Sequence, residues 1–422
     1  MDFGPASEGD TLTETFTSEF RAAFNYERVS GWIGAYYFQT DDANETTFVT
    51  PISILGLPVT EPDTILSLVT STETKVENIA VFGDITFDIS DQWTLSFGAR
   101  YDLEEFDDNG RESTVSADPA GCAIAPGIPG IGGLPCVAIL PVQPQPPNSA
   151  DFEAFLPRGT AIYRFDDLMS LSFTVARGYR SGGSYLFAEF GGVPETREYD
   201  PEFLTNYEFA FRSEFPEKDL TLNANLFYTD WEDQQVSIPG EFGFFDTEIL
   251  NSGTSELYGL EVEVKKTFSS ELSGFMSLGI LNTEFTDFAF APGSGTQFEN
   301  LAGRNFNNAP ELNISAGLTY ESADGFFLSG NFAYSDDQFS DVTNLQQNVN
   351  EDYILVNVRG GWRWDNYEVA IFADNLFDER FSNRRGLFNV DIATGTVQAN
   401  QPAGFFTVND PRLVGLEFRA GF

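Results

Sequence analysis

The sequence has no histidine, and it has only two cysteines and three methionines among its 422 residues. Without histidine a serine hydrolase lacks its general base and most transition-metal sites lack their usual ligand, so we expect no enzyme and no bound metal or cofactor. No apolar run approaches the roughly 18 to 20 residues of a membrane-spanning helix, which excludes a helical membrane protein. The formal net charge of −43 argues against nucleic acid as a partner, because its phosphates would be repelled.

The two cysteines lie in a segment, GCAIAPGIPGIGGLPC, that is too rich in glycine and proline to form a helix or a central strand. Cys122 and Cys136 are 14 positions apart, which suits a disulfide within a loop in an oxidising compartment. The alternative is a pair of free thiols in a flexible segment. A zinc site is not expected, because no further Cys and no His could complete four ligands.

Aromatic residues, in contrast, are abundant and regularly spaced. The 43 Phe and 15 Tyr are the opposite of a disordered composition, despite the high charge. In WTLSFGARYDLEEF, residues 93–106, apolar side chains occupy every second position, which is the period of a β-strand. Fifteen segments of this kind are predicted, near residues 11–24, 28–39, 74–89, 93–106, 151–164, 168–179, 202–215, 220–235, 247–268, 272–285, 309–320, 326–335, 353–364, 367–377 and 411–422.

The connections between these segments alternate between short turns, such as SDQ and PEKD, and long loops, such as residues 107–150 and 180–201. A tilted strand of about twelve residues crosses roughly 28 Å, the height of the hydrocarbon layer of a bilayer. We therefore predict an all-β, antiparallel transmembrane β-barrel in contact with outer-membrane lipid. A soluble sandwich or propeller is the alternative, but no repeat of 40 to 50 residues is visible.

The last eleven residues, RLVGLEFRAGF, keep this alternation to the end of the sequence. Their apolar positions, which we expect to face lipid, are Val414, Leu416, Phe418, Ala420 and Phe422. An alternation that ends in Phe resembles the C-terminal signal by which the barrel assembly machinery recognises bacterial outer-membrane barrels for insertion. The alternative is an ordinary amphipathic edge strand.

The number of predicted strands is odd, whereas bacterial single-chain barrels have an even number and both termini on the periplasmic side. With fifteen strands, the first and the last run in the same direction and cannot pair in an antiparallel sheet. We therefore expect an open or imperfectly joined sheet between residues 11–24 and 411–422, and a barrel that lacks its first strands. The opening MDFGPASEGD has neither the basic nor the apolar region of a secretory signal.

Six stretches resemble, in order and spacing, the barrel of the TonB-dependent outer-membrane receptors. They are ARGYRSGGSYL (176–186), YDPEFLTNYEFAFRSEF (199–215), LNANLFYTDWEDQQVS (222–237), NSGTSELYGLEVEVKKTF (251–268), GRNFNNAPELNISAGLTY (303–320) and VAIFADNLFDERF (369–381). The resemblance implies that residues 1–422 form part of a 22-stranded barrel in the bacterial outer membrane, without its N-terminal plug. It also implies a small-molecule ligand and energy coupling to the TonB system through the missing plug. A ferric chelate is our first choice of ligand; uptake of carbohydrate or cobalamin, and a passive porin, remain alternatives.

Some of these motifs also have a direct physical interpretation. Gly259 interrupts a predicted strand, which indicates a bend or close packing. Asn375 and Asp378 can bond nearby backbone where a strand gives way to its loop, so we expect them to end the strand rather than to contact a ligand. The acidic clusters TDDANE and DLEEFDDNGRE are expected at strand tops or in loops, as solvated carboxylates or, alternatively, as a Ca²⁺ site. The sequence identifies no ligand-contact residue.

Overall fold

The computed structural model describes residues 6–51, 65–117, 140–142, 148–187, 195–240, 243–251, 253–288, 300–340, 342, 344, 349–388, 390–391, 396–397 and 403–421. Within these ranges the chain is built of strands, turns and one short 3₁₀ helix, η3 (Pro216–Lys218). None of the helical residues in these ranges forms a segment long and apolar enough to cross a membrane.

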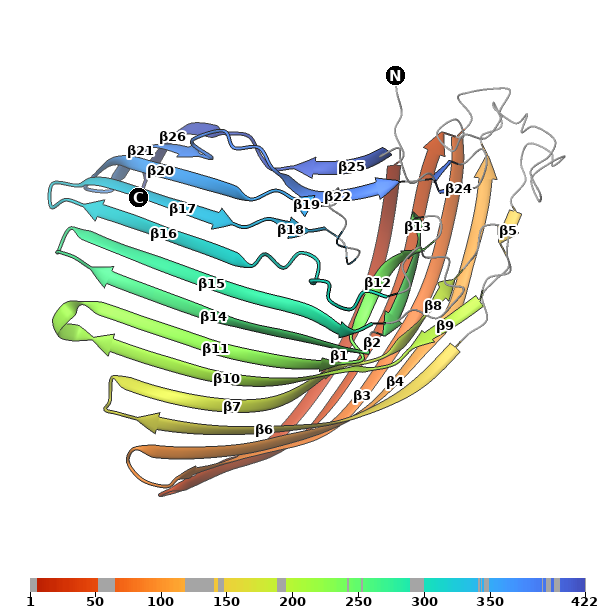
Figure 1. Cartoon of the computed structure of the whole chain (residues 1–422), viewed down its shortest axis with the longest axis horizontal. Coiled ribbons are helices and arrows are strands. Elements are labelled where there is room, and N and C mark those ends of the chain that lie inside the picture. The colour runs from red at the N-terminus through yellow and green to blue at the C-terminus, as the bar shows by residue number, and fades with distance from the viewer. Residues whose placement is uncertain are drawn as a thin grey trace.

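Fifteen strands follow one another in a single antiparallel sheet that curls around a central space (Figure 1). They are β1 (Ala6–Tyr26), β2 (Val29–Pro51), β3 (Ile65–Asp88), β4 (Trp93–Ala117), β6 (Asn148–Arg164), β7 (Met169–Arg180), β10 (Glu202–Phe215), β11 (Leu220–Glu232), β14 (Thr254–Thr267), β15 (Leu272–Asp287), β16 (Leu312–Glu321), β17 (Phe326–Ser335), β20 (Tyr353–Trp364), β21 (Tyr367–Asp374) and β26 (Leu413–Ala420). The short β5 (Leu140–Val142) pairs with β4. Among the described residues β1 and β26 are the two ends of this sheet and do not pair with each other, so the predicted open sheet is confirmed.

Five further hairpins lie in the long connections, on the side opposite the short turns (Figure 1). They are β8 (Gly183–Phe187) with β9 (Glu195–Tyr199), β12 (Gln235–Gly240) with β13 (Gly243–Asn251), β18 (Gln338–Phe339) with β19 (Val349–Asn350), β22 (Ser382–Phe388) with β25 (Ala403–Val408), and β23 (Val390–Asp391) with β24 (Thr396–Val397). The long connections are therefore partly ordered extensions of the wall.

Two features of the predicted strands are wrong. The segment 247–268 is not one strand, because β13 pairs with β12 in a separate hairpin and β14 begins only at Thr254. β2 and β4 run on past their predicted ends and β3 begins before its predicted start, so that residues predicted as loop, such as TDDANETT (40–47), are strand. The apolar alternation stops in this segment, but its backbone, which carries several threonines, continues to pair with both neighbouring strands. The strand is maintained there by this pairing and not by hydrophobic patterning.

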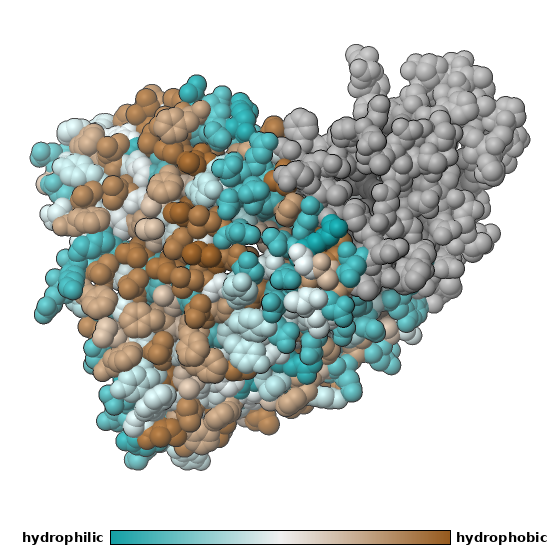
Figure 2. Space-filling view, viewed as in Figure 1, coloured by the Kyte–Doolittle hydropathy of each residue, from teal (hydrophilic) through white to brown (hydrophobic). Residues whose placement is uncertain are grey.

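The two faces of the sheet differ in chemistry as predicted. Large apolar side chains point away from the central space and stay exposed, for example Phe20, Leu226 and Leu416, whose exposed fractions are 70%, 56% and 77%. Figure 2 shows such residues gathered over the middle of the strands, with hydrophilic residues toward the strand ends. An exposed apolar band between two polar rims is the surface that lipid covers in an outer-membrane barrel.

The inner face carries aromatic rings that lie over glycines of the neighbouring strand. Phe227 is paired with Gly259, where an added Cβ would stand 2.5 Å from the ring and 2.4 Å from a carbonyl oxygen, so the prediction of close packing at Gly259 is confirmed. Phe327 is paired with Gly361 in the same way, and the guanidinium of Arg363 lies 4.2 Å from its ring centre. These cross-strand pairs fill the groove that a glycine leaves, and they bar larger residues from both glycine positions.

Candidate functional site: the lumen and its extracellular mouth

A polar groove of about 580 Å³ runs along the inner wall between β10 and β20. The polar residues that line it are Arg212, Asn223, Asn225, Glu261, Glu263, Ser277, Asn313, Ser315, Tyr334, Ser335 and Tyr353. Arg212 donates to Asn225 over 2.7 Å, and the amide of Asn225 lies 3.4 Å from Glu261. Such a wall offers both donors and acceptors, with a surplus of carboxylates, to whatever occupies the lumen.

Above this groove the segment 300–308 folds inward against the top of β15. Backbone hydrogen bonds run from Gly303 N to Phe285 O, at 2.8 Å, and from Phe285 N to Arg304 O, at 3.0 Å. Residues 283 and 285 share the face of Ser277 and Gly279, which line the groove, so the segment lies on the lumen side of the wall.

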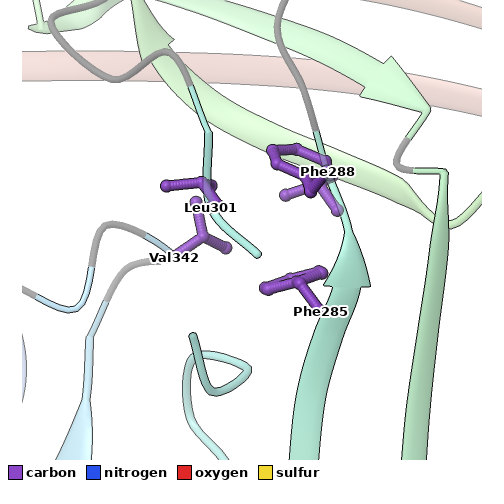
Figure 3. Close-up of a cluster of buried hydrophobic side chains, with 5 residues drawn as sticks. Phe285, Phe288, Leu301 and Val342 are labelled. Atoms are coloured by element: carbon purple, nitrogen blue, oxygen red, sulfur yellow. The ribbon is translucent and has the colours of Figure 1, made fainter. Parts of the chain in front are cut away.

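An apolar cluster holds this segment in place (Figure 3). Its buried members are Val236, Phe285, Phe288, Leu301 and Val342. Leu301 is fully buried, and the ring of Phe306 lies 4.8 Å from that of Phe285. The backbone N–H of Phe306 donates to the hydroxyl of Thr283 over 3.0 Å. The cluster joins three long connections, those that follow β11, β15 and β17, into one packed unit.

A network of side-chain hydrogen bonds joins two of the long connections, near the ends of β7, β10 and β11 that lie opposite the short turns. The side chain of Asn251 accepts from Asp200 N at 2.9 Å and donates to the carbonyls of Asp200 and Asp233, both at 2.8 Å. Nearby, the side chain of Gln235 donates to the carbonyls of Ser181 and Asp200 at 2.7 and 3.1 Å. The NSG motif at 251–253 therefore has a structural role, since its Asn substitutes for missing backbone partners where two loops cross.

A charged network lies lower on the inner wall, across β20, β21 and β26. Arg359 contacts Glu368 and Glu417, each at 2.6 Å, and Arg363 contacts Glu368 at 2.7 Å and Glu321 at 2.6 Å. It links the last strand to the wall through Glu417. The sequence analysis missed this network, although the alternation of Arg359 and Arg363 with apolar residues was its visible signal.

The motif ADNLFDERF ends its strand as predicted. Asn375 accepts from Glu379 N at 2.8 Å and donates to Glu379 O at 2.9 Å. Asp378 accepts from Arg412 N at 2.9 Å, and this hydrogen bond lowers the pKa of its carboxyl below the ordinary value. Both residues have positive φ, 50° and 56°, which Asn and Asp tolerate better than most residues. They join the end of β21 to the start of β26.

The remaining predicted positions are only partly described. Val414, Leu416 and Phe418 are exposed on the outward face of β26, in keeping with the predicted alternation, and Ala420 is half-buried there. Phe422, Cys122 and Cys136 lie outside the described residues, so the insertion signal and the disulfide stay predictions. The described residues contain no group of three or more Asp, Glu, Cys or His side chains placed to hold a metal ion. The acidic cluster TDDANE lies within the extended part of β2 and not in a loop.

A curled antiparallel sheet with an apolar outer band and a polar lumen defines a bacterial outer-membrane barrel. The family profile "TonB dependent receptor-like, beta-barrel" matches residues 2–376. The chain belongs to this family of outer-membrane receptors, and the predicted resemblance is confirmed.

Individual relatives agree with the family. The pesticin receptor of Yersinia pestis is 22% identical over 349 residues, which cover 79% of this chain and 44% of the receptor. The ferric yersiniabactin uptake receptor FyuA from Yersinia pestis has a similar fold, with a TM-score of 0.72, 19% identity and coverage of 100% of this chain and 56% of FyuA. The siderophore receptor PiuA from Acinetobacter baumannii gives a TM-score of 0.66 at 14% identity, covering 97% of this chain and 56% of PiuA. The chain thus spans about half the length of these proteins.

Proposed function

We propose that this chain is part of an outer-membrane receptor that takes up a ferric chelate with energy from the TonB system. Its family membership carries the proposal, because this family consists of receptors and transporters rather than enzymes. The names of its relatives, a ferric yersiniabactin uptake receptor and a siderophore receptor, support iron chelates as the ligand class. We assign no reaction to the chain, which contains no histidine.

The inner wall supports transport through the lumen rather than a purely structural barrel. Its groove is polar, and segment 300–308 packs against the top of β15 above it. Polar groups held in place by such packing favour capture of a specific ligand over free diffusion. We propose that residues 1–422 contribute barrel wall and mouth, and that a plug domain couples them to TonB.

The test is uptake of ⁵⁵Fe-loaded siderophores of the catecholate, hydroxamate and mixed classes by cells that carry or lack the gene. We expect uptake of at least one class to need both the gene and the proton-motive force, and to stop when an uncoupler is added. Gene-dependent uptake that survives the uncoupler would support a passive porin instead. Gene-dependent growth on cobalamin or a carbohydrate, with no siderophore uptake, would support a TonB-dependent receptor but show that its ligand is not a ferric chelate.

We also infer that the barrel assembly machinery recognises the outward face of β26. The exposed alternation of Val414, Leu416 and Phe418 supports this proposal. Deletion of residues 412–422 from the protein produced in cells should abolish its heat-modifiable, protease-resistant form. Unchanged assembly of the shortened protein would show that the signal lies elsewhere.

A further inference from the structure

An apolar groove of about 570 Å³ crosses the outward, lipid-facing wall from β14 to β20. It exists because small residues, Gly274, Ala316 and Gly330, interrupt the band of large apolar side chains. Its rim is formed by Lys266, Phe268, Leu318, Phe332, Ile354 and Val356. A groove of this depth on a barrel wall must be filled in the membrane, since an unfilled void forfeits packing contacts.

One end of this groove carries an unusual concentration of lysine. The chain has four lysines, Lys75, Lys218, Lys265 and Lys266, and three of them lie at two neighbouring periplasmic turns. The ammonium of Lys266 donates to the carbonyl of Lys218, which brings these two residues together at the rim. The ammonium of Lys218 lies 5.8 Å from the ring of Phe215, as expected for a side chain that reaches along an apolar surface toward water.

Neither rim lysine is neutralised by a carboxylate. Among the described residues Lys75 is the one lysine in an ion pair, with Glu77 at 3.1 Å. Glu217 flanks Lys218 in the turn, yet no described carboxylate lies within ion-pair distance of Lys218 or Lys266. The ammonium of Lys266 at the rim, and the ammonium of Lys218, whose backbone carbonyl Lys266 contacts, are both suited to bind the phosphate of a lipid head group.

The length of the groove fits one leaflet. Phe332 lies six positions beyond Phe326, the first residue of β17 after its periplasmic turn. At about 3.3 Å per residue and a tilt near 45°, this distance is roughly 14 Å along the membrane normal, about half of the hydrocarbon thickness. The groove therefore extends from Lys266 at the periplasmic rim to about the middle of the membrane, and ends at Ile354, which pairs with Tyr334 two positions further along β17.

We propose that this groove binds an anionic glycerophospholipid of the periplasmic leaflet. One acyl chain lies over Gly274, Ala316 and Gly330, and the phosphate sits between Lys218 and Lys266. The large negative charge of the chain would otherwise repel anionic lipid, so a local pair of lysines is what allows such a lipid to bind in a fixed place. The site is independent of the ligand that passes through the lumen.

The test is native mass spectrometry of the detergent-purified protein titrated with phosphatidylglycerol or with phosphatidylcholine. We expect one phosphatidylglycerol molecule to bind at lipid concentrations at which no phosphatidylcholine binds. Lys266→Gln should weaken phosphatidylglycerol binding about fivefold, and a second substitution, Lys218→Gln, by a similar factor. Lys265→Gln is the matched control, because Lys265 is adjacent in sequence but faces the lumen, and it should leave binding unchanged.

A second variant tests the apolar part of the groove. Gly330→Leu should reduce binding of the acyl chain whatever the head group, and an added Cβ there has room, with its nearest neighbours at 3.6 and 3.7 Å. Heat-modifiable mobility establishes that each variant is folded, and Gly330→Ala replaces the leucine variant if that one fails to assemble. Equal binding of both lipids, or equal effects of Lys265→Gln and Lys266→Gln, would overturn the proposal. A change of oligomeric state in Gly330→Leu without a change in lipid binding would do so too, because a second copy would then cover the groove.

Discussion

The assignment of the two faces of the wall predicts a large difference between two arginine substitutions on the same strand. Leu226 lies on the outward face of β11, 56% exposed, and six residues from the periplasmic start of the strand. This places it roughly 14 Å into the membrane, close to the midplane. Asn223 lies on the lumen face, with Glu263 opposite it on β14. Leu226→Arg therefore moves a charge into hydrocarbon. Asn223→Arg places a charge beside water, between the carboxylate of Glu263 and the guanidinium of Arg212, whose effects oppose each other.

The expected cost of Leu226→Arg is about 2 to 4 kcal/mol, the value for arginine on the lipid face near the midplane. This corresponds to a roughly 30- to several-hundred-fold loss in the folding equilibrium, whereas Asn223→Arg should change it little. Urea titration of the protein folded in phospholipid vesicles, followed by heat-modifiable mobility, measures both effects. Equal shifts of the two urea midpoints, or a larger shift for Asn223→Arg, would show that the faces have been assigned the wrong way round.

Three other outcomes are expected. Phe327→Ala should destabilise the barrel by about 3 to 5 kcal/mol in the same urea titration, since this 3% exposed ring fills the inner wall; no shift would refute its structural role. The ionised carboxylate of Asp378 stabilises the β21–β26 connection at pH values above the ordinary pKa of 3.8, and this stabilisation is lost as pH falls through the lowered pKa. Protection of the connection from protease should therefore depend on pH in the wild type. Asp378→Asn should abolish this pH dependence. A wild-type connection equally protected at pH 3 and pH 6 would contradict this. Non-reducing mass mapping should find Cys122 and Cys136 joined in one disulfide, and two free thiols in outer-membrane protein would end that prediction.

The strands with clear turn signals were predicted most accurately. The ranges 202–215, 326–335 and 353–364 match β10, β17 and β20 to the residue. In each case one end of the apolar alternation meets a short polar turn: PEKD follows β10, ESADG precedes β17 and DN follows β20. Periodicity and turn chemistry are both local in sequence, so a single sequence contains the information that sets these boundaries.

Interactions between distant strands could not be predicted in the same way. The contact between Arg359 and Glu417 joins residues 58 positions apart, and it depends on a register that the sequence does not state. The inward course of segment 300–308 depends on the side chain of Asn344, which accepts from Asn305 N at 2.7 Å. The groove on the lipid face is likewise visible only when Gly274 and Gly330 are placed on neighbouring parts of one surface.

Whether segment 300–308 can move away from the wall depends on the contacts that hold it there. Moving it away from the wall would expose Leu301 and Phe306 and separate both from Phe285. Full burial of a side chain is worth about 1.5 to 3 kcal/mol, so exposing Leu301 alone costs about this much, and the partly buried Phe306 and the backbone hydrogen bonds to Phe285 add to it. The arrangement against the wall is then favoured by more than about tenfold, since each 1.4 kcal/mol is a factor of ten. Segment 300–308 therefore lies predominantly against the wall.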